Sequence, residues 1–293
     1  MFVYDREKNE IKEEKQYKEN ILEFLYNNAI GRIILKFIIN PVFSEIVGLY
    51  NKSIFSKSKI TKWIKKYDIH IENYEKKKYK NFNEFFTRKY NEKCIEKIKK
   101  KIDEEKYFIS PCEGNLTIYK ITEDLKLHIK NSVYTLEELV KGEKLEEFEN
   151  GYCFLYHLTV DCYHRYCDID NGKEIKKGEI KGKLHTVSSI SSRYKIYKEN
   201  HRKYSIIETD NFGKIVFIKV GALLVGKIKD IDKPKTIKGE EKGYFELGGS
   251  TIILLVKKEQ VSIDKDIIKY SEKEIPVKVR YMEKIGEKIC SKD

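Results

Sequence analysis

The chain has 293 residues and a formal net charge of +12, with 36% charged and 40% apolar residues. This length fits one large domain or two small ones, and it is ample for a buried core. The positive balance favours an anionic partner such as an acidic lipid surface, although a lysine-rich composition also serves solubility alone. No helix-turn-helix, zinc-finger or RNA-recognition signature accompanies the charge, so we expect no nucleic-acid partner.

The six cysteines are scattered along the chain, without a CxxC pair or a histidine at the spacing of a zinc site. This pattern argues against a disulfide framework and favours a reducing compartment. We therefore expect no structural metal and no disulfide scaffold.

The N-terminal segment carries neither a secretory signal nor a membrane span. Residues 1–20 are charged throughout and lack the apolar centre of a signal peptide. The most apolar early stretch, residues 28–50, is interrupted by Arg32, Lys36 and Pro41. We predict no transmembrane helix, because no uninterrupted apolar run is long enough to cross a bilayer.

Residues 5–105 are predicted to be mainly helical, because apolar positions between Ile21 and Phe37 recur at helical spacing. Such a stripe is usually buried in a core. The alternative is a stripe that lies on a membrane, with Arg32 and Lys36 meeting lipid headgroups. From the sequence alone, burial in the core is favoured.

From about Tyr107 the pattern changes to short β-rich runs separated by glycine and polar turns, most clearly at Tyr152–Leu158, Lys214–Val220 and Thr251–Val256. The last run is continuously apolar, as expected for a strand covered on both faces. The predicted fold class is α+β. A helical N-terminal layer, residues 1–105, covers a β-rich catalytic domain, residues 106–293.

Three segments carry polar groups that are weak signals when taken singly. The two glycines before Ser250 lie between apolar runs and predict a hairpin turn. His164 reads as a surface or satisfied histidine, and Glu113 reads as an ordinary turn acid.

Taken together and in this order, the segments resemble the phosphatidylserine decarboxylase family in its clostridial form, over nearly the whole chain. Residues 82–89 resemble the family's FxxFFxRK segment, residues 110–114 its SPxDG turn and residues 163–165 its YHR motif. Residues 212–226 resemble its FG…VGAxxVG strand. Residues 242–251 are similar to its KGxFxxGGST processing site, which is the most specific of these motifs.

The resemblance implies that the chain cuts itself between Gly249 and Ser250. The Ser250 hydroxyl would attack the Gly249 carbonyl once a base takes its proton, and the peptide bond would become an ester. Elimination would leave dehydroalanine, which hydrolyses to a pyruvoyl group, the expected covalent cofactor derived from Ser250. Gly249 suits this position because no side chain hinders the approach of Oγ.

The resemblance further implies that the pyruvoyl group forms a Schiff base with the amine of phosphatidylserine. It would accept electrons as carbon dioxide leaves, so that phosphatidylethanolamine is formed. His164 is cast as the acid or base of this decarboxylation. The two fragments, residues 1–249 and 250–293, are expected to stay associated.

Two positions depart from the family's Asp–His–Ser relay for self-cleavage. Glu113 stands where the family has Asp, and a misplacement of about 1 Å can cost on the order of a hundredfold in rate. Cys167 stands where the family has His, and a thiol with a pKa near about 8.5 is a poor base at neutral pH. The base therefore stays open between His164, a Cys167 thiolate paired with it, His157 and His185.

Two functions follow from these observations. The first is a self-processed decarboxylase attached peripherally to the cytoplasmic side of an anionic cell membrane through its N-terminal region. The alternative is a non-processing, non-catalytic paralogue that binds lipid. The intact Gly248–Thr251 motif and His164 favour the first. A homodimer stays open.

Overall fold

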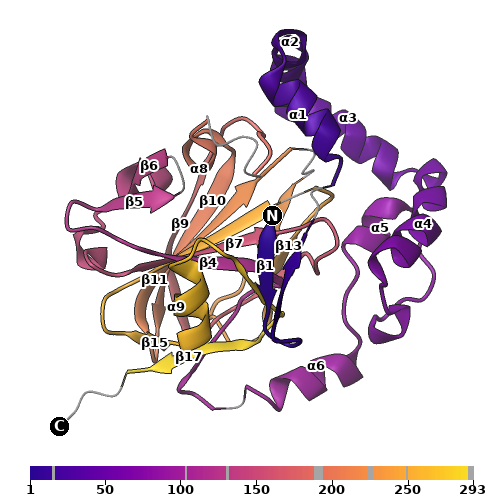
Figure 1. Ribbon diagram of the computed structural model, residues 1–293. Coiled ribbons are helices and arrows are strands. Elements are labelled where there is room, and N and C mark those ends of the chain that lie inside the picture. Colours follow the sequence, from indigo (N-terminus) through magenta and orange to yellow (C-terminus); the bar gives the residue numbers. More distant parts are fainter. Residues whose placement is uncertain are drawn as a thin grey trace.

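The computed structural model describes residues 1–14, 17–102, 104–129, 132–187, 194–223, 227–248 and 250–289. Within these ranges the main sheet has nine strands in the order β2-β1-β16-β4-β7-β14-β11-β10-β9 (Figure 1). Its strands are β1 (Phe2–Asp5), β2 (Glu10–Glu13), β4 (Gly114–Lys120), β7 (Tyr152–Leu158), β9 (Gly172–Ile180), β10 (Arg202–Thr209), β11 (Gly213–Gly221), β14 (Ser250–Val256) and β16 (Val277–Val279). All neighbours run antiparallel except β1 and β16.

Smaller sheets pack around the main one. One contains β12 (Ile228–Asp230), β13 (Glu241–Phe245) and β8 (Arg165–Cys167), and another contains β15 (Val261–Ile263), β17 (Lys284–Lys288) and β3 (Tyr107–Ile109). A hairpin joins β5 (Lys126–Ile129) to β6 (Ser132–Thr135). Short helices connect these strands: α7 (Leu136–Leu139), η3 (Glu146–Phe148), α8 (Ile196–Glu199) and α9 (Lys265–Ser271). The α+β fold class is confirmed.

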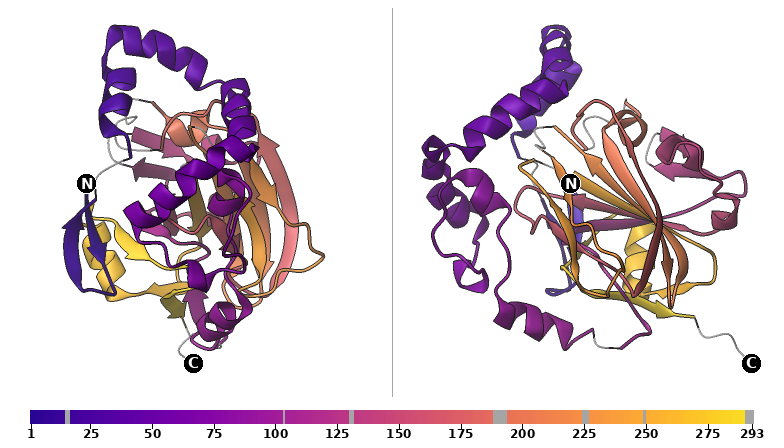
Figure 2. Two further views of the ribbon diagram at one scale, coloured as in Figure 1. Left: turned by 90° about the vertical axis from the view of Figure 1, so that its right-hand side faces the viewer. Right: turned by 180° about the vertical axis from the view of Figure 1, so that it is seen from behind.

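The N-terminal helices form an arm along one side of the main sheet, and α1 to α3 project beyond its end (Figures 1 and 2). We call residues 19–99 the helical arm; it contains α1 (Glu19–Asn27), α2 (Ala29–Ile38), α3 (Pro41–Lys52), η1 (Ile54–Lys57), α4 (Ser58–Tyr67), η2 (Ile71–Asn73), α5 (Phe82–Phe86) and α6 (Glu92–Lys99). Asparagines precede α2, α3, α5 and α6, and each side chain accepts a hydrogen bond from the first turn. These caps satisfy N–H groups that would otherwise lack partners, so they fix where the helices begin.

The strand β14 lies in the interior of the sheet, next to the middle strand β7, and its seven residues are all buried. Its edges pair with β7 and β11 along its whole length. The strands predicted at Tyr152–Leu158, Lys214–Val220 and Thr251–Val256 are confirmed. The β-branched and leucine side chains from Thr251 to Val256 fill both faces, which is why this run shows no polar alternation.

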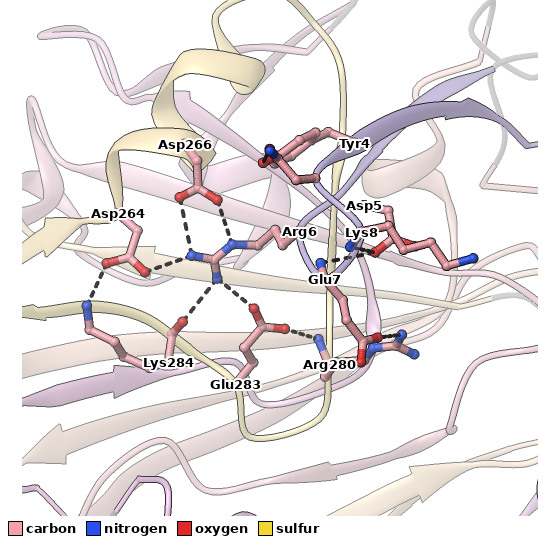
Figure 3. A network of polar contacts seen from close by, with 11 residues as sticks. Tyr4, Asp5, Arg6, Glu7, Lys8, Asp264, Asp266, Arg280, Glu283 and Lys284 are labelled. Atoms are coloured by element: carbon pink, nitrogen blue, oxygen red, sulfur yellow. Dashed lines mark hydrogen bonds and ion pairs between the residues drawn. The ribbon is translucent and has the colours of Figure 1, made fainter.

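The first residues depart from the prediction of a mainly helical N-terminal region. The strands β1 and β2 form a hairpin, and β1 pairs in parallel with β16 at the edge of the main sheet. Arg6 fixes this hairpin by ion pairs to Asp264, Asp266 and Glu283 (Figure 3). A short edge strand rich in charge carries little periodic signal, so the sequence pattern missed it. The predicted boundary at residue 105 stays a prediction.

The expectation that the apolar stripe of the arm lies in a core is wrong. Leu25 and Leu35 are buried, but most of the stripe faces outward, with Phe37 71% and Phe55 76% exposed. We call this the exposed apolar surface; it consists of Ile21, Phe24, Ile30, Ile33, Ile34, Phe37, Val42, Ile46, Leu49, Ile54 and Phe55. The helices project from the sheet, so no second layer covers them. Exposed apolar side chains gathered on neighbouring helices are typical of an interaction site.

The helices of the arm are short. In the described part of the chain, no single helix is long and apolar enough to cross a membrane. The helices α2 and α3 meet the requirement of length and composition only as a pair, and they are bent by 71°.

Candidate active site

Ser250 is the first residue of β14, an interior strand of the main sheet. Its backbone stands opposite Leu158 on β7 and Gly221 on β11. The residue is fully buried, and its Oγ atom has no hydrogen-bond partner among the described residues. Burying a hydroxyl without a hydrogen-bond partner typically destabilises a fold by about 1–3 kcal/mol. Stability therefore does not explain a serine at this position, whereas a functional role would.

The segment before Ser250 crosses between two sheets. The strands β13 and β14 belong to different sheets, so the hairpin that the two glycines predict alone is not formed. Gly248 has a φ of 134°, a backbone conformation that only glycine adopts readily. Gly249 lies outside the described residues, and so does any geometry of the Gly249–Ser250 bond.

Three contacts hold this crossing segment from outside β14. The Phe245 N–H donates to the His164 carbonyl at 2.9 Å. The Leu247 N–H donates to Asn83 Oδ1 on α5 at 3.4 Å, and Lys52 on α3 forms an ion pair with Glu246 at 3.0 Å. The helical arm is therefore attached directly to the residues that lead into Ser250.

His164 lies beside this segment and is almost fully buried. Its Nδ1 is 2.8 Å from the Cys162 carbonyl, and the ring of Phe86 lies 4.1 Å away between centroids. A hydrogen on Nδ1 leaves the lone pair on Nε2, which makes no hydrogen bond within the described residues. Burial lowers the pKa of His164 to about 3, although the carbonyls of Cys162 and Gly248 favour the protonated ring. His164 is therefore a neutral base near Gly248.

Arg165, the next residue of the motif, positions His164. Its guanidinium donates to the Thr87 carbonyl at 2.7 Å and forms an ion pair with Glu241 on β13. These contacts join the end of α5, β8 and β13 at one point, so His164 is held between the arm and the smaller sheet.

Glu113 lies among cations at the 110–114 turn. Burial raises the pKa of its carboxyl, and the charges of Arg280, Lys278 and Arg88 oppose that rise. The carboxylate makes no hydrogen bond to Ser250 Oγ, which is unpartnered in the described part of the chain.

Cys167 lies on the other side of the same turn. Its N–H donates to the Pro111 carbonyl at 2.9 Å, and its Sγ lies 4.0 Å from the Ser110 carbonyl. Burial raises the pKa of the thiol, and nearby Asp168 raises it further, so Cys167 is protonated at neutral pH. It does not bond Ser250 either. A thiolate at this position is therefore disfavoured, which weakens one of the alternatives left open by the sequence.

The two other candidate histidines, His157 and His185, make different contacts. His157 on β7 stands directly opposite Thr251, next to Ser250 in the chain, but on the strand register it points to the other face of the sheet. His185 contacts the Tyr26 hydroxyl at 3.2 Å and lies near Glu199 at 3.6 Å. Of the four candidate bases, His164 has both the free nitrogen and the place beside Gly248.

Comparison with known proteins gives the family. The sequence profile described as Phosphatidylserine decarboxylase matches residues 82–287. The chain is 49% identical to phosphatidylserine decarboxylase proenzyme 2 of Clostridium acetobutylicum, over 97% of this chain and 98% of that protein. It is 35% identical to the phosphatidylserine decarboxylase proenzyme of Clostridium novyi (strain NT), over 98% and 99%, and 37% identical to that of Clostridium botulinum (strain Hall), over 97% and 98%.

The chain belongs to the phosphatidylserine decarboxylase family. The profile and these relatives confirm the resemblance that the sequence motifs indicate. They also place Ser250, His164 and the 110–114 turn within the matched region.

The fold brings three further residues to this decarboxylase site; Asn83 and Arg88 belong to the FxxFFxRK-like segment but were given no role from the sequence, and Lys52 was missed. Asn83 and Lys52 hold the crossing segment, and Arg88 donates from Nη2 to the Cys162 carbonyl that His164 also contacts. Arg88 is the arginine of the FxxFFxRK-like segment, and that motif was the available signal. Lys52 and Asn83 carry no signal in the sequence, because their partners lie more than a hundred residues away.

We predict opposite effects for alanine at two glycines of this decarboxylase. Gly248→Ala should destabilise the chain by ~1–3 kcal/mol, because its φ of 134° is unfavourable for a residue with a Cβ. Gly48→Ala, in α3 with open space around its Cβ, should be neutral or stabilise by up to about 1 kcal/mol. Denaturant unfolding of both variants in a Ser250→Ala background, where every molecule is uncut, measures the difference. Equal changes in the free energy of unfolding for the two variants would contradict backbone strain at position 248.

Proposed function

We propose that this carboxy-lyase of the phosphatidylserine decarboxylase family converts phosphatidylserine to phosphatidylethanolamine with a pyruvoyl group made from its own Ser250. One observation carries the proposal: Ser250 begins an interior strand, is fully buried, and keeps its Oγ free of any hydrogen bond in the described residues. A hydroxyl with no structural use, held at a rigid position, suits a nucleophile. The relatives' designation as proenzymes supports processing.

The self-cleavage is a balanced rearrangement. Ser250 Oγ bonds to the Gly249 carbonyl carbon as the peptide C–N bond breaks, and the Oγ proton ends on the released nitrogen. A base then removes the Cα proton of residue 250, and the Cβ–O bond breaks to leave a Gly249 carboxylate. Hydrolysis of the resulting dehydroalanine releases ammonia and leaves the pyruvoyl group. That group supplies a carbonyl that withdraws electrons from the substrate's Cα.

We assign His164 as the base in this rearrangement. Its ring is neutral, its Nε2 lone pair is unused within the described residues, and the Gly248 carbonyl lies close by. Cys167 is a protonated thiol, and Glu113 lies among cations at the neighbouring turn. Because the cut occurs once per molecule, a slow base suffices. In turnover the same imidazole can hold or return a proton at the substrate's Cα.

The two products of the cut should remain one particle. Residues 250–256 pair with β7 and β11 on both edges, and both strands belong to the larger fragment. Arg6 of the larger fragment forms ion pairs with Asp264, Asp266 and Glu283 of the smaller one (Figure 3). The smaller fragment therefore stays in place through an interior strand and an ion-pair cluster.

Intact mass after purification should show two chains, residues 1–249 and 250–293, with the smaller one lacking a free amine. Ser250→Ala should give one uncut chain without decarboxylase activity, because the nucleophile is missing. Ser262→Ala, an exposed serine on the neighbouring β15, is the matched control and should cut normally. A wild-type chain that stays whole on long incubation would support the non-processing, lipid-binding alternative instead.

Self-cleavage should keep its rate as the pH falls from 7.5 to 5. The base must be neutral, and a pKa near 3 keeps His164 unprotonated across this interval. A histidine with an ordinary pKa near 6.5 would lose on the order of thirtyfold in neutral fraction over the same interval. The rate is measured by mass after dilution of chain unfolded in acid urea into each buffer. A midpoint near pH 6.5 would count against this assignment.

We further propose that the exposed apolar surface attaches the enzyme to the cytoplasmic face of an anionic membrane. Its substrate carries two acyl chains, so the site must meet a lipid surface. Apolar side chains on α1 to η1 can enter the acyl region while Arg32 and Lys36 of α2 contact headgroups. The prediction of a membrane-associating N-terminal region rests on this exposure. A homodimer stays an untested prediction.

Paired substitution of Phe37→Ser and Phe55→Ser should weaken binding to phosphatidylserine vesicles by at least tenfold, since two large exposed apolar side chains are lost. Phe2→Ser removes the same kind of side chain, 63% exposed and outside the arm, and serves as the control. Vesicle sedimentation at low and high salt measures the change, and salt should weaken binding further. Equal binding by all three proteins would exclude the arm as the attachment.

A further inference from the structure

Arg88 is a buried cation whose donors are largely unused. The residue is 3% exposed and follows α5 directly. Its Nη2 donates to the carbonyls of Asp161 at 3.0 Å and Cys162 at 3.4 Å, whereas Nε and Nη1 have no partner within the described residues. The rings of Tyr74 and Phe85 lie 5.0 Å and 5.3 Å from the guanidinium carbon and hold it in place.

A buried charge of this kind normally has a partner of opposite sign. Within the described part of the chain, no ion pair joins Arg88 to a carboxylate. Burial opposes its charge, and the Tyr74 hydroxyl and, more weakly, Glu113 act to keep the pKa of the guanidinium raised. Leaving a buried guanidinium without an anion is strongly unfavourable. By contrast, Arg202, which is equally buried, donates to four backbone carbonyls. Of these two equally buried arginines, only Arg88 leaves N–H groups without a partner in the described part of the chain.

The position of Arg88 relative to His164 links it to the reaction. Arg88 Nη2 and His164 Nδ1 both contact the Cys162 carbonyl oxygen. Phe86, two residues before Arg88, packs on the His164 ring. A cation with free donors thus lies beside the proposed proton-transferring side chain.

We infer that Arg88 binds the phosphodiester group of the substrate headgroup and so places the serine unit against His164. The inference rests on the proposed function. In phosphatidylserine three bonds separate the phosphorus from the Cα that loses its carboxylate, so an anion-binding group and the acid–base group must lie close together. The phosphodiester is favoured over the carboxylate, because an ion pair to the leaving carboxylate would stabilise the reactant more than the transition state.

Arg88 is buried in the uncut chain, so a headgroup can reach its guanidinium only if neighbouring contacts loosen. Self-cleavage would allow this. Leu247 packs against the cluster that contains Phe82, Phe85 and Phe86, and its N–H donates to Asn83. The cut places residues 246–248 close to a new chain end, so their contacts with α3 and α5 are free to loosen. The headgroup site would then exist only in processed enzyme.

Calorimetric titration of processed protein with two soluble ligands tests the inference. Glycerophosphoethanolamine carries the phosphodiester without the carboxylate, and L-serine carries the carboxylate without the phosphate. Arg88→Met should raise the dissociation constant for glycerophosphoethanolamine about ten- to a hundredfold, as expected for loss of a charge-assisted hydrogen bond, and leave L-serine unaffected. Arg202→Met removes a buried but satisfied guanidinium and should leave both affinities unchanged.

Different outcomes of this experiment contradict the role of Arg88 and the proposed function. Unchanged affinity of Arg88→Met for glycerophosphoethanolamine overturns the inference, and so does a loss confined to L-serine. If Arg88→Met does not fold, Arg88→Lys keeps the charge but not the planar donors and should bind severalfold more weakly; wild-type affinity in that variant overturns the inference. A wild-type chain that never cuts refutes the proposed function instead, and intact mass shows this before any titration.

Discussion

The pairing of β14 on both edges, with both faces buried, is the constraint on which the rest of this structure depends. A strand in this position cannot shift its register without moving a complete set of side chains from one face to the other. Ser250 takes its position from that strand, so its hydroxyl is fixed as firmly as the core itself. The strand pairing alone therefore orients Ser250.

The groups around Ser250 come from a different part of the fold. His164 and the crossing segment are held by β8, β13 and the helical arm, through Arg165, Asn83 and Lys52. The site therefore lies where a rigid sheet meets elements that reach out to the exposed apolar surface. The same α5 helix that supports the crossing segment carries Phe86 and leads to Arg88, so the helical arm and the site are joined through α5.

Much of the core was predictable from the sequence, because the central strands carry long apolar runs that only burial explains. The motif residues His164 and Ser250 were predictable as well, through the resemblance. The exposure of Phe37 was not, since an amphipathic stripe looks the same whether a core or a membrane covers it. The β1 hairpin and the tie between Lys52 and Glu246 were also missed, because both depend on contacts between distant segments.

The proposed cut at the start of β14 has a consequence for how the molecule folds and unfolds. The uncut chain folds as one polymer, whereas a processed molecule that unfolds releases a short fragment that must find its partner again by diffusion. The first folding of the uncut chain would not depend on protein concentration, whereas refolding of the two fragments would. The rate at which processed enzyme unfolds, rather than an equilibrium free energy, would then determine its stability. The pyruvoyl terminus would serve as a chemical record that the surrounding sheet had assembled correctly.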